Sequence, residues 1–219
     1  MKKLLVVLLL FGMAASANAD VIAAWDFNGT NAVDAGGILA AAVLGGNVQA
    51  ASITVGSGIT PQNTASTWIG DDWLPTATLA DAVLNNKYLE WTVAAAAGYQ
   101  MTITNFAGLA RDPGGTGPTN FVLRSSVDGY TADLAVYQLA GNQALSTPLS
   151  LSGQTTVTFR YYGFDPVRVG TTGTGGFRNL VGNDLTITGT IMAVPEPASM
   201  ALLALGLGAL VVARRRAKR

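Results

Sequence analysis

The chain has 219 residues, 13 basic and 13 acidic side chains, and neither cysteine nor histidine. The absence of these two residue types excludes disulfides, thiol nucleophiles and imidazole-based triads. It also excludes the zinc and haem sites that need such ligands. Seven of the 13 cations lie in the first three and last six residues, which leaves residues 20–193 with a net charge of about −6. That charge argues against nucleic acid as a partner.

The first 19 residues have the order of a secretory signal peptide. A lysine pair precedes the apolar residues 4–13, and Ala17 and Ala19 fit the small-x-small cleavage pattern. Cleavage before Asp20 predicts an exported protein whose folded part, residues 20–193, is long enough to bury a core as one domain.

The folded part opens on a predicted strand in which Trp25 and Phe27 share one face, because side chains alternate along a strand. Residues 31–75 are rich in Ala, Gly, Thr and Asn and predict weak strands and loops. Thr78 then has the position of a helix N-cap, with Asp81 reaching back to it, which predicts a short helix that ends at an Asn-Asn pair.

From residue 88 onward the alternation predicts a series of strands. Leu89, Trp91 and Val93 alternate with Tyr88, Glu90 and Thr92, and similar runs follow at residues 99–104, 121–125, 134–137, 155–162 and 184–191. Their spacing and the abundant glycine and threonine predict an all-β fold, an antiparallel β-sandwich. This domain would lie between the signal peptide and a single hydrophobic helix at the C-terminus.

Three segments of this part, residues 87–93, 123–130 and 156–163, occur in the order found in a jelly-roll domain of bacterial surface proteins. The chain resembles that domain over about residues 85–192. The resemblance implies a jelly-roll-like fold similar to carbohydrate-binding modules, and it brings no catalytic residues.

Asp71 and Asp72 are flanked by Trp68 and Trp73, an acidic pair beside rings suited to stacking on a sugar. They are a candidate glycan contact, with a solvated loop between two core-edge tryptophans as the alternative. Together with Glu90 they are also the carboxylates from which a hydrolase pair could be drawn.

Asp26, Asn28 and Asp184 are candidate calcium ligands. The first two offer oxygens near the first strand, and Asp184 starts the predicted last strand, which adjoins the first in many jelly rolls. The alternative is an Asx turn in which Asp26 accepts local N–H groups. No other metal or cofactor is expected.

Arg124 and Arg160 occupy predicted strand positions and, with Arg168 and Arg178, could meet an acidic glycan. The simpler expectation pairs the two strand arginines with Asp128 or Asp165.

The C-terminal end, residues 194–219, has three parts. Pro195-Glu196-Pro197 precedes the apolar residues 198–213, and the basic tail follows as Arg214, Arg215, Arg216, Lys218 and Arg219. As a helix the apolar part spans about 24 Å, whereas the hydrocarbon core of a bilayer is roughly 30 Å thick. One more helical turn, or local thinning of the bilayer, would close this gap. The cations predict a cytoplasmic tail and an exported domain.

This order of motif, apolar segment and basic tail resembles the PEP-CTERM sorting signal, which exosortases recognise in Gram-negative bacteria that make exopolysaccharide. The resemblance implies that Pro195, Glu196 and Pro197 are the recognition motif and that the tail is removed at or near it. The inner membrane would hold residues 198–213 only transiently.

We therefore expect a non-enzymatic protein of the cell envelope, cell surface or extracellular matrix, with an exosortase-type enzyme as partner and exopolysaccharide as a further one. Three alternatives stay open. They are a carbohydrate-binding module with an aromatic platform drawn from Trp68, Trp73 and Trp91, a carboxylate-only hydrolase, and a permanently anchored envelope protein.

Overall fold

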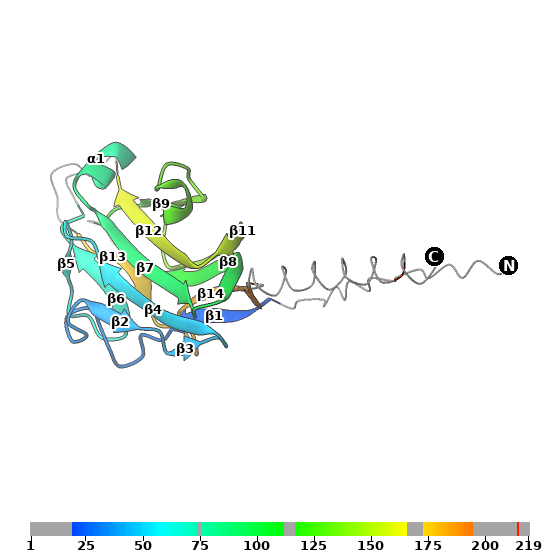
Figure 1. Cartoon of the computed structure of the whole chain (residues 1–219). Helices are drawn as coiled ribbons and strands as arrows, with labels where there is room; N and C mark the ends of the chain where they lie inside the picture. The colour runs from blue at the N-terminus through cyan, green and yellow to red at the C-terminus, as the bar shows by residue number, and fades with distance from the viewer. Residues whose placement is uncertain (1–18, 74–75, 112–116, 166–172, 195–213, 215–219) are drawn as a thin grey trace.

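The computed structural model describes residues 19–73, 76–111, 117–165, 173–194 and 214, and these form two antiparallel sheets packed face to face (Figure 1). The first sheet has the order β3 (Val43–Leu44), β1 (Asp20–Trp25), β14 (Leu185–Ala193), β8 (Tyr99–Ala110), β13 (Gly175–Arg178), β6 (Thr67–Asp71) and β5 (Thr60–Pro61), with β11 (Gln143–Gln154) also paired to β8. The second has the order β10 (Ala135–Gln138), β9 (Asn120–Ser125), β12 (Thr156–Phe164), β7 (Tyr88–Ala95), β4 (Val48–Val55) and β2 (Ile38–Ala40). The predicted antiparallel β-sandwich is confirmed.

Aromatic side chains from both sheets fill the core. The Trp91 ring, on β7, stacks on Phe159 of its own sheet with ring centroids 5.9 Å apart and on Phe106 of the other sheet at 5.2 Å. Phe177 meets the same indole edge-on at 5.8 Å. Aromatic side chains bury 150–250 Å² each, so this cluster is a main source of the apolar burial that holds the sheets together.

The alternation predicted for β7 is confirmed. Leu89, Trp91 and Val93 have no exposed surface and face the core, whereas Glu90 lies on the outer face opposite an arginine of β12. Tyr88 is also nearly buried, although it belongs to the outer row, because its ring packs with Tyr162 under the only α-helix of the described chain.

That helix, α1 (Leu79–Leu84), begins as predicted. The Thr78 hydroxyl accepts a hydrogen bond from the Asp81 N–H at 3.2 Å, and the Asp81 carboxylate accepts one from the Thr78 N–H at 3.1 Å. This reciprocal capping box satisfies two of the donors that a helix start leaves free. Asn85 is the C-cap, and Ala82 is the helical residue that is buried against β12 and β7.

Two parts of the sequence hold more strand than expected. The segment predicted as weak strands and loops contains all of β2 to β6, and its apolar Ile53 lies in the core. The twelve-residue strand β11 was not predicted at all. Leu145, Thr147 and Leu149 alternate along it with exposed residues, of which Pro148 is one, and its pairing with β8 is irregular after that proline.

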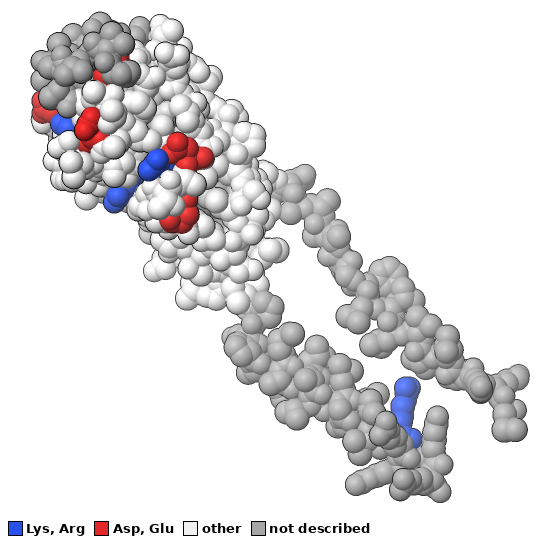
Figure 2. Space-filling model, turned by 90° about the horizontal axis from the view of Figure 1, so that it is seen from above, with Lys and Arg blue, Asp and Glu red and all other residues white. Residues whose placement is uncertain are grey.

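Charged side chains are unevenly distributed along the sandwich. Figure 2 shows them over the middle and one end of the side in view, while the other end is formed by uncharged residues. The charged end is built by the last residue of β6, Asp71, and by the connections that follow β1, β6 and β13, which carry Asp26, Asp72 and Asp184.

In the ranges described above, no helix combines the length and the apolar character needed to cross a membrane. The predicted hydrophobic helix at residues 198–213 and the signal peptide at residues 1–18 lie outside those ranges.

Candidate functional site

The C-terminal candidate segment starts directly where the sandwich ends. Ala193, the last residue of β14, pairs with Tyr99 of β8, and the next N–H, that of Val194, donates to the Gly98 carbonyl at 2.8 Å. The motif Pro195, Glu196 and Pro197 lies outside the described residues, as does the basic tail except for the exposed Arg214. Almost no chain therefore separates the last strand from the motif.

The N-terminal candidate segment reaches the same end of the domain. Ala19 is exposed, and Asp20 opens β1 opposite Gly189 of β14. Because the two strands are antiparallel, the chain enters the sandwich beside the point where Val194 leaves it. Ala17 lies outside the described residues, so cleavage before Asp20 stays a prediction.

The aromatic platform predicted from Trp68, Trp73 and Trp91 is wrong, because all three side chains have no exposed surface. Trp68 stacks on Phe27 with centroids 6.1 Å apart, and Trp73 meets Phe121 edge-on at 5.5 Å. Trp73 and Trp91 contact rings of the opposite sheet, Trp68 packs inside the core beside Phe27, and none of the three rings is available to stack on a sugar.

The three candidate carboxylates do not come together. Glu90 is on the outer face of the second sheet, whereas Asp71 ends β6 of the first sheet and Asp72 follows it. The Asp71 carboxylate accepts a hydrogen bond from Gln62. Burial, helped by the Asp72 charge, raises the pKa of Asp71. This separation contradicts a hydrolase pair that uses Glu90. Asp71 and Asp72 are the only candidate carboxylates left for the hydrolase hypothesis.

Glu90 is instead held by Arg160, directly opposite it on β12. The Arg160 Nε lies 2.7 Å from a Glu90 oxygen, and the guanidinium carbon lies 4.4 Å from the centre of the Tyr88 ring and 4.1 Å from that of Tyr130. Arg160 is thus enclosed by an acid and two ring faces, an arrangement that favours its charged form.

The predicted partners of the strand arginines are wrong. Arg160 pairs with Glu90, and Arg124 pairs with Asp133 at 2.7 Å. Asp128 accepts backbone N–H groups in the turn after β9, and Asp165 accepts the Thr119 hydroxyl. Arg160 pairs with Glu90 because the register of β12 against β7 places them opposite each other. This register cannot be predicted from a single sequence.

Two of the three side chains assigned to calcium, Asp26 and Asp184, are already engaged. The Asp184 carboxylate, which is buried, accepts the N–H groups of Phe27 and Leu180, and Asp26 accepts the Asn28 N–H at 2.8 Å. Burial raises the pKa of Asp184, and the charge of Asp26 raises it further. The two N–H groups lower this pKa but do not outweigh burial. Inward-pointing N–H donors do not fit a cation, so the contacts favour the alternative of an Asx turn at Asp26.

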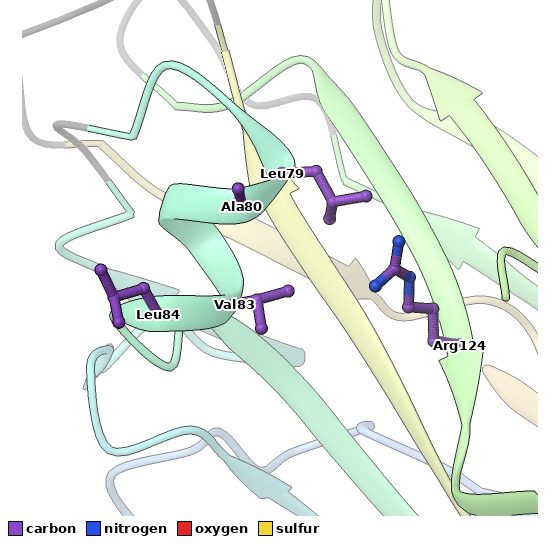
Figure 3. A pocket seen from close by; sticks show the side chains of 5 residues that line it. All are labelled: Leu79, Ala80, Val83, Leu84 and Arg124. Carbon is purple, nitrogen blue, oxygen red and sulfur yellow. The ribbon is translucent and has the colours of Figure 1, made fainter. Parts of the chain in front are cut away.

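A groove that the sequence did not reveal lies between α1 and β9 (Figure 3). It has a volume of about 670 Å³ and is lined by Leu79, Ala80, Val83, Leu84 and Arg124. In Figure 3 the Leu79 and Val83 side chains point toward Arg124, and Leu84 lies farther from it. The guanidinium of Arg124 is already bound to Asp133 and to the Tyr130 carbonyl.

Comparison with known families places one match on the chain, at residues 193–217, to the PEP-CTERM protein-sorting motif. No curated protein and no solved structure matched the chain. The match begins at the last residue of β14 and includes the proline-glutamate-proline motif, the apolar segment and most of the basic tail. The chain carries a PEP-CTERM sorting signal, which indicates an exported protein that an exosortase sorts to the cell envelope or surface.

Proposed function

We propose that this chain is a non-enzymatic surface or extracellular-matrix protein that an exosortase-type enzyme releases from the inner membrane. The observation that carries the proposal is the position of the sorting motif, residues 193–217, at the end of β14. Because the strand ends at Ala193, cleavage at or near Pro195 leaves both sheets complete. The released product is then a folded sandwich.

Each part of the signal has a physical task in this proposal. Pro195 and Pro197 lack an N–H and disfavour helix, so they keep the motif extended for the enzyme. Residues 198–213 hold the chain in the bilayer until cleavage, and the basic tail stays on the cytoplasmic side. The retained alternative, a permanent anchor, uses the same segment without cleavage.

We extend the proposal to weak, multivalent contact with exopolysaccharide. Ser146, Ser150 and Ser152 of β11 are exposed and offer hydroxyl groups of the kind that hydrogen-bond to sugars. The net charge of about −6 on residues 20–193 favours a neutral polymer over an acidic one. With the tryptophans buried, such contact would come from many polar groups and not from one stacking platform.

The test is the intact mass of the protein recovered from native envelope and culture-medium fractions. We expect a form that runs from Asp20 to the neighbourhood of Pro195. Replacing both motif prolines, Pro195→Ala with Pro197→Ala, should leave a membrane-bound form that still contains Arg219. The matched control is Pro148→Ala, an exposed proline of β11, which should be processed normally. If the unaltered protein retains Arg219 in every fraction, the proposal is wrong and the permanent anchor is right.

Enzymatic activity has its own test, because the adjacent aspartates remain as acids. The proposal predicts that Asp71→Asn and Asp72→Asn leave any polysaccharide hydrolysis by the purified protein unchanged. Hydrolysis that disappears in either variant, while the fold persists by circular dichroism, would establish the hydrolase alternative.

A further inference from the structure

The end of the sandwich where both chain termini lie has a surface of its own, which we call the terminal face. It is formed by residues 45–49, 96–98 and 152–155, which connect strands of the two sheets, together with Asp20 and residues 192–194.

Backbone hydrogen bonds join these segments. The Ala96 N–H donates to the Asn47 carbonyl at 2.7 Å, the Ala95 N–H to the Thr155 carbonyl at 2.8 Å, and the Val194 N–H to the Gly98 carbonyl at 2.8 Å. The terminal face is therefore one continuous surface.

The terminal face differs from the rest of the protein in charge. Among its residues only Asp20 is ionisable through its side chain, and the others are Gly, Ala, Val, Met, Ser, Thr, Asn and Gln. Met192 and Val194 are 52% and 43% exposed there. For comparison, a soluble protein surface is designed with about 25–35% charged residues. Cleavage before Asp20 would add an α-amino group beside the one carboxylate, which further reduces the local net charge.

The acidic side chains at the opposite end of the domain lie far from this face, whereas Glu90 on β7 and Asp128 in the turn after β9 lie nearer to it. β8 has twelve residues between its Tyr99 end, at the terminal face, and its Ala110 end, and at about 3.3 Å per residue it spans about 36 Å. The Ala110 end carries Asp71, the last residue of β6, and Asp72 and Asp184 in the connections there. That distance exceeds three Debye lengths of about 10 Å at 0.1 M salt, so these acids barely contribute to repulsion at the terminal face.

The length of chain beyond the strand limits what can lie next to this face. Residues 195–197 alone separate Val194 from the apolar segment at residue 198. Whatever their conformation, the four peptide steps from Val194 to residue 198 reach at most about 14 Å. Each interfacial layer of a bilayer is about 5–8 Å thick. A chain anchored by residues 198–213 therefore keeps the terminal face at or next to the lipid headgroups.

We propose that the terminal face rests on the headgroup layer of the membrane during sorting, with Met192 and Val194 as its apolar contacts and the acidic end directed away. This inference rests on the anchoring part of the proposed function. Its partner is a lipid surface, because an uncharged end is the part of an acidic domain that can approach anionic lipid without repulsion.

The experiment uses the full chain in vesicles of phosphatidylethanolamine and phosphatidylglycerol. Since the chain has no cysteine, Ser152→Cys on the terminal face and Ser57→Cys in the exposed connection after β4 each take one environment-sensitive fluorophore. Lipids with a nitroxide on the headgroup should quench the label at 152 strongly and the label at 57 little, after correction for quenching by a water-soluble nitroxide.

A second pair of variants tests the charge argument. Thr155→Glu together with Ala97→Glu should reduce the quenching at position 152, and an acid placed at Thr60, beyond β4, should not.

The outcomes separate the two proposals. A chain that does not float with the vesicles refutes the anchoring by residues 198–213 and, with it, this inference. A chain that floats but shows equal quenching at 57 and 152 overturns the inference alone. So does a chain that self-associates in dilute solution with the label at 152 shielded, because the terminal face would then bind a second copy.

Discussion

Trp91→Phe and Trp73→Phe remove the same part of an indole from positions of equal burial, yet we expect them to differ in stability. Both side chains have no exposed surface. The Trp73 Nε1–H donates to the Gly70 carbonyl at 2.7 Å, whereas the Trp91 Nε1–H finds no acceptor among the described residues. The pair therefore separates the effect of packing from that of a buried hydrogen bond.

The expected difference follows from what each change leaves behind. Both variants lose similar apolar volume and create similar cavities, so those costs largely cancel in the comparison. Trp73→Phe also loses a hydrogen bond and leaves the Gly70 carbonyl without that donor, which costs about 1–3 kcal/mol. Trp91→Phe removes an unpaired donor instead. We expect Trp73→Phe to be the less stable by about 2 kcal/mol, or roughly 4–8 °C in Tm.

The assay is urea unfolding of the chain from Asp20 to Val194, which contains both sheets, followed by circular dichroism. Trp25, whose Nε1 donates to the Leu39 carbonyl at 3.2 Å, and Trp68, whose Nε1 also has no acceptor in the described chain, provide a second pair for the same comparison. Equal losses within both pairs, or a larger loss for Trp91→Phe than for Trp73→Phe, would refute the reasoning.

Three further changes have expected outcomes. Thr78→Ala should cost about 1 kcal/mol by removing the cap of α1, with faster hydrogen exchange at the Asp81 amide, whereas exposed Thr155→Ala should stay within about 0.5 kcal/mol. Glu90→Gln should cost no more than about 1 kcal/mol, because its partly exposed ion pair is screened, and the loss should shrink in high salt. Burial raises the pKa of Asp184 in the folded protein above its ordinary value of 3.8. The protonated side chain therefore contributes its full stabilisation below pH 3.8, and this contribution is lost as the pH rises through the folded pKa. Unfolding from pH 3 to 7 should therefore show the wild type losing stability relative to Asp184→Asn in that window, and a flat difference there contradicts the assignment.

Local patterns were sufficient for the elements that local physics determines. The alternation around Trp91 predicted β7, because a buried sheet face requires period two. Thr78 and Asp81 predicted the start of α1, because a capping box is complete within four residues. The expected pairing of the first strand with the last is present as well, in the contact of Asp20 with Gly189.

Contacts between distant segments could not be predicted in the same way. A tryptophan beside acids is equally compatible with a sugar platform and with a core position, and Trp68 is buried against Phe27, which follows β1 and is distant in sequence. Arg160 has Asp165 only five residues away in sequence, yet its partner Glu90 is 70 residues away. Strand β11 was not predicted although its alternation is regular, since a proline within the run, Pro148, argues against a strand.

The location of β14 has a consequence for how the protein folds during export. The last strand to leave the translocation channel lies between β1, the first, and β8. Until Leu185 arrives, β1 and β8 present unpaired edges that can bind other chains or proteases. To close this gap, β14 must pair with β1, which lies at the opposite end of the sequence. This step is slow, because the conformational entropy of the intervening chain is lost before the contacts form. The motif at Pro195 follows Leu185 by only ten residues, so the signal for release reaches the membrane as the sheet becomes able to close.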